Sequence, residues 1–280
     1  MYSIKQKEED LFVRWEEAFK KNGEESFCSN GGLLFRGEFG LNEINQYNEY
    51  TWYRLQGNEE TLWSSSCKRL MILTKDLNDV DGWDIREESG GRRHLSEKVI
   101  PSDAELRYLG KNFYRRLNRW VYGIYNESAG VYPSFTDVAD YKKMGMFYET
   151  APLVRINCKV EIGGPRVENQ VLADSINTYK DKDYLIEQIN IYQANIILCC
   201  GYTAKEGNII LNFLKENIIR DLEEVNDTNG WIYYSQKKNV IAINAYHPTA
   251  WGFSDKWLYE ELVGNFSNAV DTLKIRFSPL

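Results

Sequence analysis

Short apolar runs alternate with amphipathic segments along most of this chain. The apolar runs have the length of buried strands, and they span residues 70–73, 153–157, 195–199, 231–234 and 240–244. Apolar residues at helical spacing mark residues 4–22, 103–125, 181–192, 203–220 and 255–273. Strands that alternate with helices of this length predict an α/β protein, a three-layer αβα fold with a mainly parallel central sheet.

The N-terminal part of the chain follows this pattern less clearly. Residues 27–40 are rich in glycine around a short strand or loop, and residues 41–68 look mainly helical. Residues 126–151 look irregular and are rich in aromatic side chains. No repeat or low-complexity linker divides the remainder, so we expect an N-terminal helical extension over residues 1–60 and one compact domain over 61–280.

The composition argues against several classes of protein. Hydrophobic residues make up 43% of the chain and aromatic residues 14%, which is enough for a sizeable core. No apolar stretch reaches the about 18 residues of a membrane span, and the first residues lack the apolar core of a signal peptide. We therefore expect a cytoplasmic protein without membrane contact. Five cysteines without CxxC spacing argue against a disulfide framework and a zinc or iron–sulfur site, so neither metal nor cofactor is expected.

The charge pattern allows two interpretations. A net charge of −7 does not favour a nucleic-acid binder, although a local basic patch can operate within an acidic chain. The helix predicted over residues 103–125 has such a basic side, made of Arg107, Lys111, Arg115, Arg116 and Arg119. It is either a solvated helix face or a surface that contacts phosphates. The second interpretation makes candidate phosphate contacts of Arg92, Arg93, Arg115 and Arg119.

Polar side chains come at the ends of three predicted strands. Asp76 follows the run RLMILTK, Asn157 ends LVRIN, and His247 follows VIAINAY. Ligands of open α/β sheets bind beyond the carboxyl ends of the strands, so a carboxylate, an amide and an imidazole are expected to gather there. Each residue also fits a structural role, with Asp76 as a cap, Asn157 as a turn former and His247 as a residue that leads into a helix.

These strand ends resemble motifs of the uracil-DNA glycosylase superfamily. LMILTKDLND is similar to the family's GQDPYH-like motif, LVRINCKV to its LLLN-like motif, and NAYHPTAWGF to its HPS motif. The resemblance covers about residues 65–270. Thr74 and Lys75 stand where the first motif has Gly and Gln, and Thr249 replaces the serine of the last motif. The resemblance implies the family's α/β fold and hydrolysis of the N-glycosidic bond of a base flipped out of double-stranded DNA.

The resemblance also implies a role for each motif residue. Asp76 orients the attacking water and stabilises the sugar cation, Asn157 reads the edge of the base, and His247 stabilises the departing base anion. The last motif is followed in the family by a loop that wedges into the duplex. The other residues implied to contact the base or the duplex are Asn78, Phe147, Tyr148, Thr249, Trp251 and Phe253. Each of these aromatic residues equally fits a core position.

The position of Asn78 suggests the kind of base. In the uracil-specific branch a tyrosine at this position excludes a methyl group at carbon 5 of the pyrimidine, whereas Asn78 is shorter and polar, and Leu77 replaces a stiffening proline. We expect a pocket that is open beside carbon 5. The resemblance then implies a defence enzyme that excises C5-modified pyrimidines, such as glucosylated hydroxymethylcytosine, from phage DNA.

Several alternatives stay open on the sequence. They are a uracil-type repair glycosylase, a non-catalytic module of the same fold that binds a nucleotide or a partner protein, and a hydrolase of free nucleosides. Lys75 suggests one more alternative, a lyase that forms a Schiff base, although Asp76 beside it favours a charged lysine. The sequence leaves the oligomeric state open.

Overall fold

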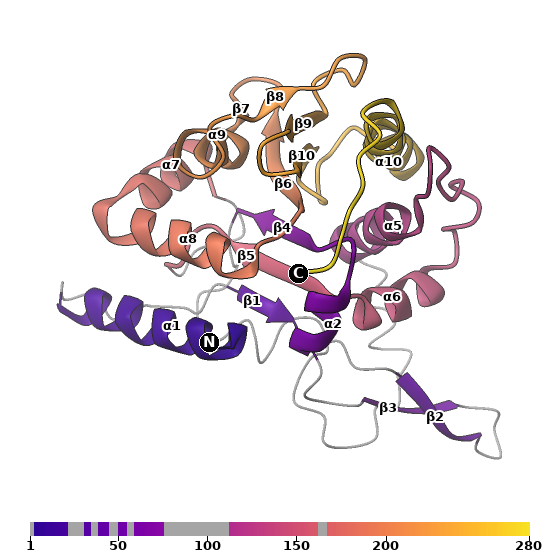
Figure 1. Ribbon diagram of the computed structural model, residues 1–280, viewed down its shortest axis with the longest axis horizontal. Helices are drawn as coiled ribbons and strands as arrows, with labels where there is room; N and C mark the ends of the chain where they lie inside the picture. The colour runs from indigo at the N-terminus through magenta and orange to yellow at the C-terminus, as the bar shows by residue number, and fades with distance from the viewer. Residues whose placement is uncertain are drawn as a thin grey trace.

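The fold is built on a mixed β-sheet. The structure is a computed structural model, which describes residues 3–21, 31–34, 39–44, 50–54, 59–75, 112–161 and 167–280. The strand order is β1-β5-β4-β6-β10-β9-β8, and β7 pairs with β6 (Figure 1). The central strands are parallel, and they are β5 (Leu153–Asn157), β4 (Leu70–Thr74), β6 (Ile196–Thr203) and β10 (Val240–Tyr246). The predicted α/β class is therefore confirmed.

Antiparallel strands complete the sheet on both sides of this parallel centre. β1 (Gly31–Leu34) pairs with β5, and β9 (Ile232–Ser235) pairs with β10. β8 (Glu223–Glu224) lies next to β9, and the short β7 (Gly207–Asn208) folds back on β6. The sheet is thus mixed, with its parallel strands placed so that their carboxyl ends meet at one edge.

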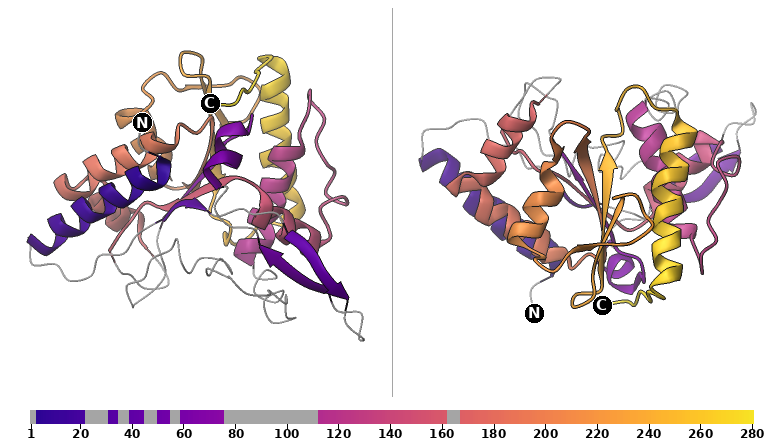
Figure 2. Two further views of the ribbon diagram at one scale, coloured as in Figure 1. Left: turned by 60° about the horizontal axis from the view of Figure 1, so that its bottom comes forward. Right: turned by 90° about the horizontal axis from the view of Figure 1, so that it is seen from above.

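Helices cover both faces of the sheet, as the view along it shows (Figure 2). One face is covered by α1 (Ile4–Lys21), α7 (Asn169–Asn177), α8 (Tyr179–Tyr192) and α9 (Ile209–Asn217). The other face is covered by α5 (Asn112–Asn126), α6 (Tyr141–Thr150) and α10 (Asp255–Thr272). Both faces of β4 are buried, because Leu70 and Ile72 join one core and Met71 and Leu73 the other.

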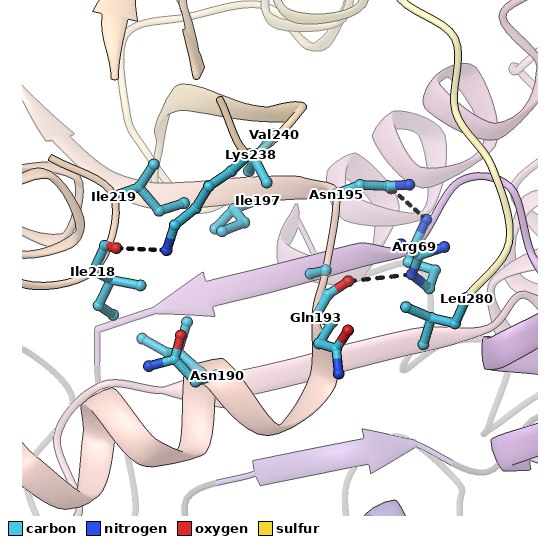
Figure 3. A pocket seen from close by; sticks show the side chains of 12 residues that line it. Arg69, Asn190, Gln193, Asn195, Ile197, Ile218, Ile219, Lys238, Val240 and Leu280 are labelled. Atoms are coloured by element: carbon cyan, nitrogen blue, oxygen red, sulfur yellow. Dashed lines mark hydrogen bonds between the residues drawn. The ribbon is translucent and has the colours of Figure 1, made fainter. Parts of the chain in front are cut away.

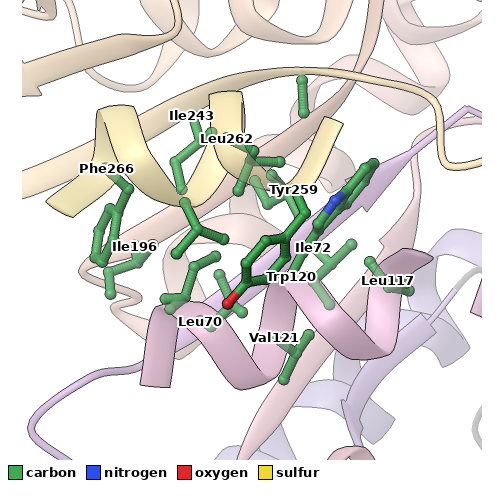
Figure 4. Close-up of a cluster of buried hydrophobic side chains, with 14 of the residues drawn as sticks. Leu70, Ile72, Leu117, Trp120, Val121, Ile196, Ile243, Tyr259, Leu262 and Phe266 are labelled. Atoms are coloured by element: carbon green, nitrogen blue, oxygen red, sulfur yellow. The ribbon is translucent and has the colours of Figure 1, made fainter. Parts of the chain in front are cut away.

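The core between α5, α10 and the sheet fixes how closely these two helices approach. Strand residues such as Leu70, Ile72 and Ile243 pack against Trp120 of α5 and Leu262 of α10 (Figure 4). Gly123 lies at the crossing of the helices. A Cβ atom there would lie 2.8 Å from Val263 Cγ2 and 2.9 Å from Tyr259 Oη. The glycine is therefore needed for the close packing of α5 against α10. Packed in this way, α5 brings the polar side chains near its N-terminus to the carboxyl edge of the sheet.

The N-terminal segment belongs to the body of the molecule. The helix predicted over residues 4–22 is present as α1, and its Leu11, Trp15 and Phe19 are buried against the sheet and α8. β1 extends the main sheet beside β5. The domain boundary near residue 60 stays a prediction, while α1 supplies buried residues to one of the two cores and β1 pairs within the main sheet.

Other predicted helices needed correction. Residues 41–68 contain the strands β2 (Phe39–Ile44) and β3 (Tyr50–Arg54), which form a separate two-stranded sheet, and only then the helix α2 (Glu59–Ser65). The aromatic and β-branched residues of YTWYR favour a strand. The helix predicted from residue 203 begins only at Ile209, because Asn208 caps it by accepting hydrogen bonds from two backbone N–H groups. Conversely, α6 and α7 form where no helix was predicted.

In the described part of the chain, no helix is long and apolar enough to cross a membrane.

Candidate active site

The ends of the central strands bring polar residues to one edge of the sheet. Thr74 ends β4, Asn157 ends β5, and the two residues are neighbours in the strand register. β10 ends at Tyr246, so His247 lies at the same edge. Because β4 and β6 lie between β5 and β10, and strands are spaced about 4.8 Å apart, Asn157 and His247 flank a span of roughly 14 Å.

Four of the candidate residues lie outside the described residues, and they are Asp76, Asn78, Arg92 and Arg93. The candidate site is therefore built from the residues that the structure describes at this edge, beginning with the amide of Asn157.

Asn157 is buried and fixed by β4. Its residue surface is 5% exposed, and the Thr74 hydroxyl, which is also buried, donates a hydrogen bond to Asn157 Oδ1. Backbone bonds continue beyond the strand ends, with Cys158 N donating to Thr74 O (2.8 Å) and Lys159 N to Lys75 O (3.1 Å). The Asn157 side chain thus has a set orientation, as a residue that reads a ligand by hydrogen bonds requires.

His247 is held in one tautomer by the residue two positions later. The backbone N–H of Thr249 donates to His247 Nδ1 (3.3 Å), and the Thr249 hydroxyl lies 2.8 Å from the same nitrogen. Since Nδ1 accepts a hydrogen bond from the backbone, the ring proton of the neutral imidazole is on Nε2. This assignment leaves Nε2–H as a donor at the edge of the sheet.

The surroundings of His247 keep its ring neutral. The ring lies 5.6 Å, between centroids, from that of Phe113 on α5. Although part of the residue stays exposed, burial by its neighbours and, to a smaller extent, the positive charge of Lys75 lower the pKa of His247 to about 4. At neutral pH, His247 is therefore an uncharged hydrogen-bond donor, a form in which an imidazole can polarise an oxygen atom of a ligand.

Lys75 joins the ends of β4 and β6. Its Nζ donates to Asn169 Oδ1 on α7 (2.7 Å), and Asn169 Nδ2 in turn donates to Glu206 Oε2 (2.5 Å) just after β6. Burial lowers the pKa of Lys75, while the charge of Glu206 opposes this shift. The network holds a cation close enough to His247 to influence the protonation of its ring.

The loop that follows His247 is fixed to α5 by one arginine. Arg116 Nη1 donates to the carbonyls of Pro248 (2.9 Å) and Ala250 (2.7 Å), and Nη2 donates to that of Phe253 (3.0 Å). Trp251 projects from this loop with 89% of its surface exposed. The loop of residues 247–253 therefore presents one aromatic side chain to solvent beside the candidate site.

Arg115, Arg116 and Arg119 of the predicted basic side form an internal ion-pair network, and Arg107 and Lys111 lie outside the described residues. Arg115, Arg116 and Arg119 all bind the Asp255 carboxylate, with N–O distances of 2.7, 2.7 and 2.8 Å. Arg116 and Arg119 are buried, and the guanidinium of Arg119 also lies over the ring of Phe135. The interpretation of this side as a solvated or phosphate-contacting face is thus wrong for these two residues, because both are buried and bind Asp255 and backbone carbonyls. Arg115 stays partly exposed.

The aromatic candidates divide into buried and exposed side chains. Tyr148 is fully buried, so a role in stacking on a base is not compatible with its position. Phe147 packs edge-on against Tyr122 at a centroid distance of 4.9 Å. Phe253 stacks on Trp257 at 4.9 Å. Of the aromatic candidates, Trp251 alone lies fully on the surface.

Three residues of the site region were missed in the sequence. Phe113 contacts the ring of His247, Asp255 collects the arginines of α5, and Arg155 is buried on β5 beside the Tyr114 hydroxyl (3.2 Å). A charged residue inside the apolar run LVRIN was a signal for Arg155. The Ser254–Asp255 pair was a signal of a helix start, and Ser254 does cap α10, but the partners of Asp255 had no local signal.

Comparisons with known proteins leave the site to be interpreted from its own geometry. No known family model matches the chain, and no curated protein is similar to it. Within the described part of the chain, no group of three His, Cys, Asp or Glu side chains is placed to hold a metal ion. The edge combines a buried amide, a neutral imidazole, a half-buried lysine and an exposed aromatic loop, a set suited to binding and polarising a planar, oxygen-bearing ligand.

Proposed function

We propose that this protein is a monofunctional DNA glycosylase, which hydrolyses the N-glycosidic bond of a pyrimidine flipped out of double-stranded DNA. The observation that carries the proposal is His247. It follows the last parallel strand, is neutral at physiological pH, and presents Nε2–H at the same edge as the amide of Asn157. This combination agrees with the roles implied by the motif resemblance.

The proposed reaction separates charge, and the site supplies groups for it. The bond between C1′ and the base nitrogen breaks, its electron pair moves to the base, and water adds to C1′ and gives up a proton that ends on the departed base anion. The Nε2–H of His247 donates to an oxygen of the base as negative charge develops there. Loss of one such donor typically raises the barrier by about 3–4 kcal/mol. Lys75 adds positive charge nearby, and the resemblance assigns the water to Asp76.

Recognition and base flipping are assigned to the two ends of the site. Asn157, held by Thr74, reads the edge of the base. Extrusion of a base costs a few kcal/mol of stacking and pairing. We assign the filling of the gap in the duplex to Trp251, and its exposure on a loop that Arg116 holds next to His247 supports this assignment.

The proposed substrate is a C5-modified pyrimidine of phage DNA, such as glucosylated hydroxymethylcytosine. This part rests on the resemblance at Asn78. Unmodified bases would leave polar groups of an open pocket unpaired, and each buried unpaired group costs about 1–3 kcal/mol. Host DNA would thereby be spared.

The experiment is competitive base release from matched duplexes, followed by mass spectrometry. The duplexes carry uracil, thymine, cytosine, hydroxymethylcytosine or its glucosylated form at one site. We expect release of the modified base and loss of that release, by orders of magnitude, in Asp76→Asn, while Lys20→Ala on the far face stays fully active. A preference for uracil would refute the open pocket, and an unimpaired Asp76→Asn variant would refute the assignment of Asp76.

One observation favours a second candidate, a hydrolase of free nucleosides. Asp255 binds Arg115, Arg116 and Arg119, so these three arginines of the described chain offer little cationic surface to a duplex. Nucleosides as substrates, with no release from duplex DNA, would establish this alternative. Release from the duplex alone would exclude it.

A further inference from the structure

A pocket opens at the amino edge of the central strands, opposite the candidate active site (Figure 3). Its volume is about 290 Å³, and its walls come from the starts of β4, β6 and β10, the end of α8 and the C-terminal Leu280. Ligand pockets commonly have volumes of about 300–1,000 Å³, so this pocket suits a compact small molecule. It is independent of the proposed function, since none of the residues discussed for that function lines it.

The pocket carries an excess of positive charge. Two cations, Arg69 and Lys238, line it, none of the described lining residues is Asp or Glu, and the acidic group among them is the terminal carboxylate of Leu280. Arg69 is only 6% exposed, and its guanidinium donates to the carbonyls of Gln193 (3.2 Å), Ser66 (3.2 Å) and Ser278 (2.6 Å). These acceptors are neutral, so they satisfy donors without cancelling the charge. Among described residues no carboxylate pairs with Arg69, and a buried charge without a counter-ion is costly.

Donors for a ligand remain on both cations. Arg69 Nη2 makes no hydrogen bond to a described residue, because the three carbonyl contacts use Nε and Nη1. Lys238 donates from Nζ to Ile218 O (2.9 Å), which uses one of its three N–H groups. Figure 3 shows the two side chains at different ends of the pocket, with Gln193 beside Arg69 and Ile219 beside Lys238.

Between these cations the wall is apolar. Ile197, Ile219 and Val240 line this wall, and each is less than 8% exposed. The orientation of the Asn195 amide is fixed, because Oδ1 accepts from Arg69 N (2.8 Å) and Nδ2 donates to Cys67 O (2.7 Å). A ligand that covers the apolar wall and carries negative charge satisfies both features.

We infer that this pocket binds a small organic anion, whose carboxylate or phosphate pairs with Lys238 at one end and whose apolar body lies against Ile197, Ile219 and Val240. Charge-assisted hydrogen bonds to arginine or lysine are stronger than neutral ones, so the charge of the ligand dominates its affinity. The apolar wall distinguishes the ligand from an inorganic ion.

The test is binding of matched probes to the full chain, followed by NMR. Benzoate and phenyl phosphate carry the anion on one ring, and benzamide is the uncharged counterpart of benzoate. We expect both anions to bind at least tenfold more tightly than benzamide, and their ranking separates a carboxylate site from a phosphate site. Nuclear Overhauser contacts from the probe ring to the methyl groups of Ile197 and Ile219 locate the site.

Paired variants complete the test. Lys238→Met should weaken binding of the anions about tenfold and leave benzamide unchanged, whereas Lys237→Met, in the same turn and outside the pocket, should change neither. A thermal unfolding curve for each variant checks that the fold is retained. Equal binding of benzoate and benzamide, no binding of either anion at millimolar concentration, or equal loss in both lysine variants would overturn the inference.

Discussion

His247 shows how one side chain acquires a chemical state from its neighbours. The hydrogen bond from Thr249 N fixes the tautomer, and burial with the charge of Lys75 lowers the pKa to about 4. In the unfolded chain the pKa is about 6.5, so the unfolded state binds the proton first as the pH falls. The contribution of neutral His247 to stability is thus fully present above pH 6.5 and is lost as the pH falls through 4.

Between pH 6.5 and 4, the titration of His247 should lower the free energy of unfolding by at most about 3 kcal/mol. The variant His247→Gln should lack this part of the acid sensitivity. The NMR titration of the ring is a direct check, because the chain has only two histidines and the variant identifies the signal. A pKa of His247 at or above 6.5 would contradict the neutral donor.

At the same scale, the sequence predicted positions better than partners. Asn157 and His247 were placed at strand ends by apolar runs that precede them, and the structure brings both to one edge. The state of Arg119 was not predictable locally, because Asp255, its ion-pair partner, is 136 residues away in the chain. Burial of a charged residue depends on such distant partners, which a helical pattern does not contain.

At the scale of elements, the packing of α5 against α10 depends on Gly123. Gly123→Ala should lower the free energy of unfolding by about 1–3 kcal/mol, because the new Cβ would lie 2.8 Å from Val263 Cγ2. Gly264→Ala is the matched control, since its Cβ would mainly meet the partly exposed Tyr132 Oη at 3.0 Å, which can shift. Urea unfolding measures both. Equal stability of the two variants would mean that the helices separate without cost.

The ion pairs between α5 and α10 also hold the loop of residues 247–253. Asp255→Ala leaves Arg116 and Arg119 without their carboxylate, so we expect a loss of about 3 kcal/mol in stability. The exposed pair of Glu187 with Arg14 is the control, and Glu187→Ala should cost less than about 1 kcal/mol. If the two losses measured by urea unfolding are alike, the network is only a surface feature.

Trp251 gives a prediction for that loop. Trp251→Ala should slow base release from duplex DNA about tenfold or more, and leave release from single strands nearly unchanged, because a single-stranded base is less stacked and unpaired. Rates on paired and unpaired forms of one oligonucleotide measure the effect. An equal loss on both forms would assign Trp251 to base contact instead of duplex opening.

The elements themselves were predicted in part. Helices α1, α8 and α10 and strands β4, β5 and β10 follow clear apolar patterns, and they form close to the expected positions. The sheet of β2 and β3 was predicted as a helix, because its strands are too short to show a clear periodic pattern of apolar residues. The late start of α9 depends on the cap at Asn208, a detail of single hydrogen bonds.

At the scale of the whole molecule, the central strands connect two polar edges with different chemistry. The carboxyl edge has the amide and the neutral imidazole of the candidate active site, and the amino edge has the cationic pocket around Arg69. The apolar patterns predicted the sheet that separates these edges. They did not predict the pocket, because its walls come from segments that meet only when the chain is folded.

The central claim is that His247 stabilises a departing base. The most direct measurement is the single-turnover rate of base release from a duplex with the preferred modified pyrimidine, for wild type, His247→Ala and the distant control Lys20→Ala. We predict that His247→Ala lowers the rate about 100- to 1,000-fold with little change in DNA affinity and a retained fold, while Lys20→Ala has the wild-type rate. A folded His247→Ala variant with the wild-type rate, or a wild-type protein that releases no base, would contradict the account.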